Sequence, residues 1–117
     1  MKAYTDLEQS RKLAEFLPLE SADMNYATWT ILEDGEFIVS PNYGNTIENL
    51  QEDYGNQIIP CWSLAALFNV IESKCSYFEL VHLKTYRLSA EIDDIYGEEL
   101  IDVFYEMILK LNEQKLL

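Results

Sequence analysis

The chain of 117 residues carries 21 acidic and 8 basic side chains, a formal net charge of −13, and 49% of its residues are hydrophobic. That apolar share is enough for a packed interior, so the charge does not imply disorder, and the length suits a single domain, residues 1–117. The negative charge disfavours binding to nucleic acid or to an anionic membrane, and no apolar run approaches the roughly 20 residues of a membrane helix.

The N-terminal part of the chain predicts a helix followed by a β-hairpin. Thr5-Asp6-Leu7-Glu8 has the pattern of a capping box, so we expect a helix over 6–17 that ends before Pro18. Its inner side would carry Leu7, Leu13, Ala14 and Leu17. Two segments rich in β-branched and aromatic residues flank Asp34-Gly35, which predicts a hairpin over 26–40.

The middle of the chain combines a polar segment with an apolar helix. Residues 42–57 contain two glycines and four asparagines, and we expect a loop with a short helical turn near 47–53. Pro60 fits the first position of a helix, so the next helix is expected at 61–71. Apolar residues recur there at helical spacing, which predicts a central core helix: Leu64, Leu67, Phe68 and Ile71.

The C-terminal part predicts two further strands and a long helix. The strands are expected at 77–83 and 86–92, with one long bent strand as the alternative. A loop is expected at 93–97, and a helix at 98–115 with an apolar stripe of Leu100, Phe104, Met107, Ile108 and Leu111. The order α-β-β-α-β-β-α predicts an α+β domain in which helices pack on an antiparallel sheet.

One pair of residues could support chemistry. Cys61 lies at the predicted start of a helix, where the dipole lowers the pKa of a thiol, and His82 is the one histidine. Together with the aromatic residues they could form a small enzyme or a small-ligand site. No oxyanion or orienting motif accompanies them, so we prefer structural roles and assign no catalytic residue.

Acidic residues are densest around the start of the last helix: Asp93, Asp94, Glu98, Glu99, Asp102 and Glu106. A hard cation could bridge such carboxylates, but the Asp-x-Asp-x-Asp-Gly order of a calcium loop is missing. We interpret the cluster as a solvated helix face and expect no metal and no cofactor. The polar N-terminus does not resemble a secretory signal, and two cysteines are too few for a disulfide scaffold, so we expect a cytoplasmic protein.

Three blocks of the sequence carry a resemblance. They are residues 2–10 running on to 17–24, residues 59–67 around Pro60-Cys61-Trp62-Ser63, and residues 106–117. Together they resemble a numerous group of short acidic proteins of gut bacteria, often associated with prophages or mobile elements and without an established activity. Members often have a histidine just before the position of Glu113, where this chain has Asn112, which argues against a catalytic histidine shared with the group. It also implies that residues 25–58 are the variable part.

The distribution of charge favours an interaction module. Between Lys12 and Lys74 the chain has ten carboxylates and no basic residue. We therefore expect a non-enzymatic protein that binds a basic protein partner and that, in one version, imitates the phosphates of DNA. The expected contact residues are Glu33, Asp34 and Glu36 in the hairpin turn, and Glu48, Glu52 and Asp53 in the polar segment. A homo-oligomer that hides apolar surface between copies is a further alternative.

Overall fold

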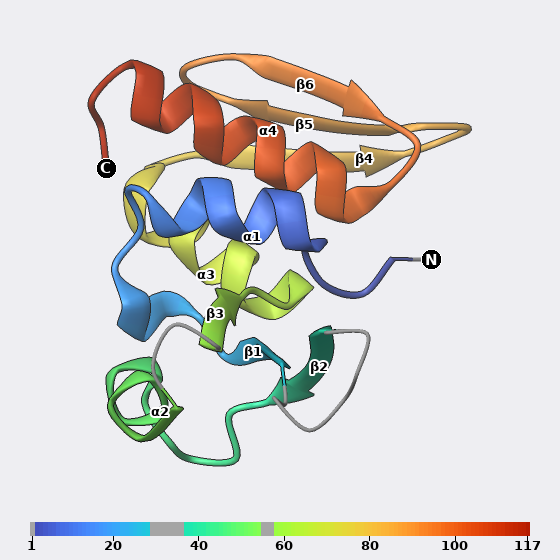
Figure 1. Ribbon diagram of the computed structural model, residues 1–117. Coiled ribbons are helices and arrows are strands. Elements are labelled where there is room, and N and C mark those ends of the chain that lie inside the picture. Colours follow the sequence, from blue (N-terminus) through green and yellow to red (C-terminus); the bar gives the residue numbers. More distant parts are fainter. Residues whose placement is uncertain (1, 29–36, 55–57) are drawn as a thin grey trace. The chain divides into compact units, whose positions relative to one another are not determined.

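The computed structural model describes residues 2–28, 37–54 and 58–117 (Figure 1). In chain order its elements are α1 (Leu7–Ala14), the 3-10 turn η1 (Leu19–Ser21), β1 (Met24–Thr28), β2 (Phe37–Pro41), α2 (Ile47–Tyr54), β3 (Ile58–Cys61), α3 (Leu64–Lys74), β4 (Phe78–His82), β5 (Tyr86–Ala90), β6 (Asp94–Gly97) and α4 (Leu100–Glu113). Within the described ranges the strands form two antiparallel sheets, β2-β1-β3 and β4-β5-β6. The predicted α+β class is confirmed, and α2, β3 and β6 are additions to the predicted order.

Two compact units are distinguished along the chain. The N-terminal unit comprises Asp6–Ser63, and the C-terminal unit comprises Met1–Thr5 together with Leu64–Leu117. The sheet β2-β1-β3 belongs to the N-terminal unit, and the sheet β4-β5-β6 belongs to the C-terminal unit. Among the described helices, none combines the length and the apolarity that crossing a membrane requires.

The capping box of α1 lies one residue later than predicted. The Asp6 carboxylate accepts a hydrogen bond from the Gln9 backbone N–H at 2.8 Å, and the Gln9 side chain accepts one from the Asp6 backbone N–H at 3.1 Å. The predicted box of Thr5 and Glu8 is therefore wrong. The sequence pattern of a capping box fits both residue pairs. Aspartate is as good an N-cap residue as threonine, and glutamine can take the place of glutamate at the third helical position. Burial distinguishes them, since Thr5 is fully buried and Glu8 is exposed.

The sheet of the N-terminal unit confirms the predicted hairpin and corrects the segment around Pro60. Thr28 pairs with Phe37 in an antiparallel register, while the predicted turn at 34–35 lies outside the described residues. Pro60 does not open a helix; it lies in strand β3, opposite Asn25 of the central strand β1. An edge strand such as β3 tolerates proline, because an N–H that points away from the sheet is not needed for pairing.

The polar segment after β2 contains a helix of two turns, longer than the predicted helical turn. The Thr46 hydroxyl accepts a hydrogen bond from the Asn49 backbone N–H at 3.1 Å, which caps α2. Ile47 is buried and Leu50 is partly buried. The helical turn predicted near 47–53 is therefore confirmed, and the helix extends one residue further, to Tyr54.

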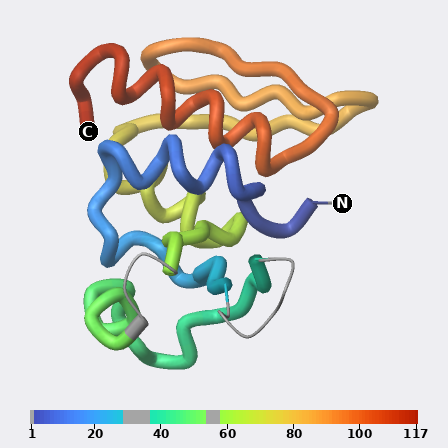
Figure 2. Tube along the Cα trace, in the orientation of Figure 1, coloured from blue at the N-terminus to red at the C-terminus, as the bar shows by residue number. Residues whose placement is uncertain are grey.

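In the C-terminal unit, α4 packs on the sheet β4-β5-β6 and against α3 (Figures 1 and 2). The predicted hairpin of β4 and β5 is confirmed, so the alternative of one bent strand is wrong. The loop predicted over 93–97 is also wrong, because β6 pairs with β5 and places Ile95 beside the buried Leu88. Gly97 ends β6 where an added Cβ would lie 2.8 Å from a methyl carbon of Val103, so the close approach of β6 to α4 requires glycine.

The predicted packing of the two apolar helices is confirmed. Phe68 of α3 lies 6.3 Å from Phe104 of α4 and 5.4 Å from Phe78 of β4, measured between ring centroids. The helix starts differ from the prediction, at Leu64 instead of 61 and at Leu100 instead of 98. The buried core of this unit includes Leu67, Ile71, Leu88, Ile101, Val103, Phe104, Met107, Ile108 and Leu111.

Candidate functional site

The negative charge of the chain is concentrated in the N-terminal unit. Its sequence holds eleven acidic and two basic residues, a net charge of −9. The C-terminal unit is about equally long but holds ten acidic and six basic residues, a net charge of −4. A partner of opposite charge would therefore be attracted mainly to the N-terminal unit.

Both cations of the N-terminal unit already have partners within it. The guanidinium carbon of Arg11 lies 5.6 Å from the centroid of the Phe37 ring. The ammonium nitrogen of Lys12 lies 3.1 Å from a carboxylate oxygen of Glu15. Neither cation is paired with a carboxylate of α2, so the negative charge of that helix is left for other partners.

Helix α2 carries three of the six predicted contact residues. Glu48, Glu52 and Asp53 are all exposed, and in the part of the chain that the structure describes none of them forms an ion pair. Glu48 and Glu52 stand four residues apart and share one flank of the helix, whereas Asp53 is the i+3 neighbour of Leu50 on another flank. The other three predicted residues, Glu33, Asp34 and Glu36, lie outside the described residues.

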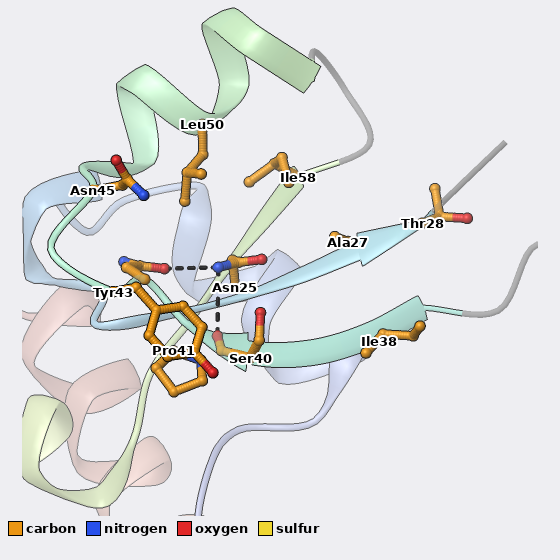
Figure 3. A pocket seen from close by; sticks show the side chains of 11 residues that line it. Asn25, Ala27, Thr28, Ile38, Ser40, Pro41, Tyr43, Asn45, Leu50 and Ile58 are labelled. Carbon is orange, nitrogen blue, oxygen red and sulfur yellow. Dashed lines mark hydrogen bonds between the residues drawn. The ribbon is translucent and has the colours of Figure 1, made fainter.

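A cavity of about 180 Å³ opens within the N-terminal unit, between α2, the sheet and the segment that joins them (Figure 3). Figure 3 shows Leu50 and Ile58 on one side of Asn25, with Ser40 and Ile38 of β2 on the other. Its walls are mostly apolar, with a few polar groups at the base and the rim. The lining residues are Asn25, Ala27, Thr28, Ile38, Ser40, Pro41, Asn42, Tyr43, Asn45, Leu50 and Ile58.

Two buried asparagines form an ordered chain of amides at the cavity. The side-chain nitrogen of Asn42 donates to the Ala22 carbonyl at 3.1 Å, so the side-chain oxygen of Asn42 must face Asn25. Asn25 then presents its nitrogen, which donates to that oxygen at 2.9 Å and to the Ser40 carbonyl at 3.4 Å. The Asn25 oxygen points away from both bonds (Figure 3) and accepts no hydrogen bond from the described residues. The cavity therefore contains a fixed hydrogen-bond acceptor.

Tyr43 stands at the rim in a conformation that tyrosine rarely adopts. Its φ is +52°, and Gly44 follows with φ +82°. The Asn45 N–H donates to the Asn42 carbonyl at 3.0 Å, which closes a tight turn with positive φ at both central positions. Asparagine or glycine would occupy the Tyr43 position with less strain, yet an aromatic side chain that is 81% exposed is found there. The string Asn42-Tyr43-Gly44-Asn45 signals a turn, but no sequence pattern indicates Tyr43 as a site residue.

Cys61 and His82, the candidate pair that the sequence analysis set aside in favour of structural roles, lie in different elements. Cys61 is fully buried in β3 and does not start a helix, so the argument from a helix dipole was wrong. His82 ends β4 in the C-terminal unit, is exposed and stacks on Tyr86 with ring centroids 4.1 Å apart. Trp62 is fully buried, and its indole N–H donates to the Ser21 hydroxyl at 2.9 Å. Of the eight tyrosines, Tyr43 lines the cavity.

The acidic cluster near α4 is partly neutralised by Lys2. The Lys2 ammonium lies 2.8 Å from Asp102, and the Lys2 backbone N–H donates to Glu99 at 3.1 Å. Across residues 2–28, 37–54 and 58–117, no group of three or more His, Cys, Asp or Glu side chains is arranged to hold a metal ion. The cluster thus fastens the N-terminal residues to α4 within the C-terminal unit.

We expect both thiols to resist alkylation in the native state. Cys61 is fully buried, and burial raises the pKa of the Cys75 thiol, which the Glu91 carboxylate raises further. Labelling with iodoacetamide at pH 7 should therefore be slow until denaturant is added. Because the pKa of Cys75 is raised in the folded chain, the folded state holds the thiol proton more tightly than the unfolded state does. The contribution of this thiol to the free energy of unfolding is therefore complete below the unfolded pKa of about 8.5 and is lost as the pH rises through the folded pKa. Rapid native labelling of Cys61 at pH 6 would instead indicate an activated thiol.

Comparison with known proteins does not extend this description. No protein-family model, no curated protein and no solved structure matches the chain. The features that bear on function are therefore the charge of the N-terminal unit, the helix α2 and the cavity beside it.

Proposed function

We propose that the chain is an interaction module whose N-terminal unit binds a basic protein partner. The observation that carries the proposal is the net charge of −9 on a unit whose two cations are held by Phe37 and Glu15. Glu48, Glu52 and Asp53 form the described part of the binding surface. Complementary charge of this kind accelerates association and selects basic surfaces over acidic ones.

A more specific form of the proposal concerns proteins that bind DNA. Exposed carboxylates on a small domain can occupy a groove that otherwise holds phosphates, because both present dense negative charge to the same lysines and arginines. The resemblance to proteins of mobile elements supports this form, since an imitator of DNA could occupy a DNA-binding host protein. In that case this protein and DNA would compete for one site on the partner.

The test uses a defined basic probe at two ionic strengths. We expect a fluorescein-labelled peptide with eight lysines to bind the full chain at 20 mM NaCl and to bind about tenfold or more weakly at 300 mM, because the screening length of exposed charges shortens from roughly 20 Å to about 6 Å. Fluorescence anisotropy gives the affinity, and stopped-flow mixing gives the association rate. A peptide with eight glutamates serves as the matched control and should not bind.

Two outcomes would contradict the proposal. Binding that is the same at both salt concentrations would show that apolar contacts, not charge, drive association. No binding at 20 mM NaCl would show that the negative surface does not capture basic chains. For the DNA-imitating form, a partner that binds this protein and a DNA duplex at the same time would refute it.

A further inference from the structure

We infer that the cavity beside α2 receives an arginine side chain from the basic partner. This inference rests on the proposed function, because it names the partner residue that the same unit would anchor. The cavity of about 180 Å³ belongs entirely to the unit with a net charge of −9. One water occupies about 30 Å³ of liquid, so the space suits a side chain better than a single solvent molecule.

The walls of the cavity suit the methylene stem of arginine. Ile38, Leu50 and Ile58 supply apolar surface on opposite sides of Asn25 (Figure 3). Arginine covers such surface with its three methylene groups while its charged end remains near polar groups. A carboxylate or phosphate ligand would find no described cation among the lining residues and would be repelled by α2.

The base of the cavity supplies an acceptor that a guanidinium can use. Asn25 is 5% exposed, and its amide is fixed by the bonds to Asn42 and Ser40. The Asn25 side-chain oxygen can therefore accept a hydrogen bond from an N–H group of a ligand without rotation of the side chain. Guanidinium has five N–H donors and no acceptor, so it matches a lone carbonyl oxygen with nearby negative charge.

Tyr43 at the rim favours arginine over lysine. A planar guanidinium stacks on an aromatic ring and is more weakly hydrated than an ammonium, so it loses less on leaving water. The Tyr43 ring is 81% exposed and is held in the left-handed region, so the fold gains little from an aromatic residue there. An exposed ring retained in an unfavourable conformation is expected at a ligand contact. Asp53, the i+3 neighbour of the lining residue Leu50, adds negative charge nearby.

The test compares two peptides of equal charge on three forms of the full chain. The probes are fluorescein-labelled peptides that differ only in having four arginines or four lysines. We expect the arginine peptide to bind the wild-type chain about threefold to tenfold more tightly. Tyr43→Asn should remove this preference, since it removes the ring, while Tyr43→Phe should keep it. Asparagine tolerates positive φ, so Tyr43→Asn should be at least as stable as the wild type in urea unfolding.

A second measurement locates the peptide directly. In ¹⁵N-labelled protein, the side-chain NH₂ signals of Asn25 should shift on titration with the arginine peptide and stay in place with Tyr43→Asn at the same concentration. Equal binding of both peptides to the wild type, with unchanged Asn25 signals, would overturn the inference and leave the proposed function standing. Failure of both peptides to bind at low salt would overturn the proposed function itself.

Discussion

Replacing Phe104 by alanine is expected to lower the free energy of unfolding by about 3–5 kcal/mol, the range for removing a buried aromatic side chain. Phe104 is 2% exposed in α4, and its ring lies 6.3 Å from that of Phe68 in α3. The substitution removes apolar contacts and leaves a cavity that the two helices can fill only in part. Urea unfolding followed by far-UV circular dichroism measures the loss.

The matched control is Leu83→Ala in the turn between β4 and β5. Leu83 is 84% exposed, so its truncation should change stability by no more than about 0.5 kcal/mol. A cost below about 1 kcal/mol for Phe104→Ala would show that the core has been misplaced.

The same unfolding experiment tests the prediction of one domain over residues 1–117. Both tryptophans, Trp29 and Trp62, belong to the N-terminal unit, whereas circular dichroism reports helices of both units. A single cooperative domain requires coincident transitions by fluorescence and by circular dichroism. Two separate transitions by circular dichroism, with Phe104→Ala shifting only the one that tryptophan fluorescence does not report, would instead show two domains.

Reversing the charges of α2 is expected to have the largest effect on partner binding. The triple variant Glu48→Lys, Glu52→Lys and Asp53→Lys changes the net charge of the N-terminal unit from −9 to −3. At low ionic strength each exposed ion pair between a carboxylate of α2 and a peptide lysine contributes up to about 1 kcal/mol to the binding free energy. The affinity for the eight-lysine peptide should therefore fall about tenfold to a hundredfold. All three side chains are exposed, and the fold should be retained because no described ion pair is lost.

A second triple variant separates the position of the charges from their number. Glu72, Glu98 and Glu106 are exposed acids of the C-terminal unit without a described ion pair, and reversing them changes the net charge of the chain by the same amount. We expect this control to weaken peptide binding by less than about threefold, since screening limits the reach of surface charges. Equal losses in both variants would show that only the total charge matters and would refute a binding surface on α2.

The amino-acid sequence by itself determined most of the secondary structure. Apolar residues at helical spacing located α3 and α4 to within three residues at their N-terminal ends, because both helices bury a stripe of side chains in a core. The hairpin pairs β1–β2 and β4–β5 were predicted from β-branched and aromatic segments between turn residues. The concentration of charge was also visible, since an interval without a basic residue can be read directly from the sequence.

Only the tertiary structure decided the features that depend on residues far apart in the chain. Pro60 fits a helix start and an edge strand equally well by local pattern, and its pairing opposite Asn25 selected the strand. The polar stretch 93–97 became β6 because β5 offers a free edge and Gly97 permits close approach to Val103.

The cavity likewise required the assembled N-terminal unit. Asn25, Tyr43 and Leu50 come from β1, a turn and α2, and no local pattern relates them. The positive φ of Tyr43 belongs to the turn closed by the hydrogen bond from Asn45 to Asn42, a position where asparagine or glycine would be the local preference. Local periodicity and charge thus specify which elements form, whereas the pairing and packing of distant elements specify where a binding site can lie.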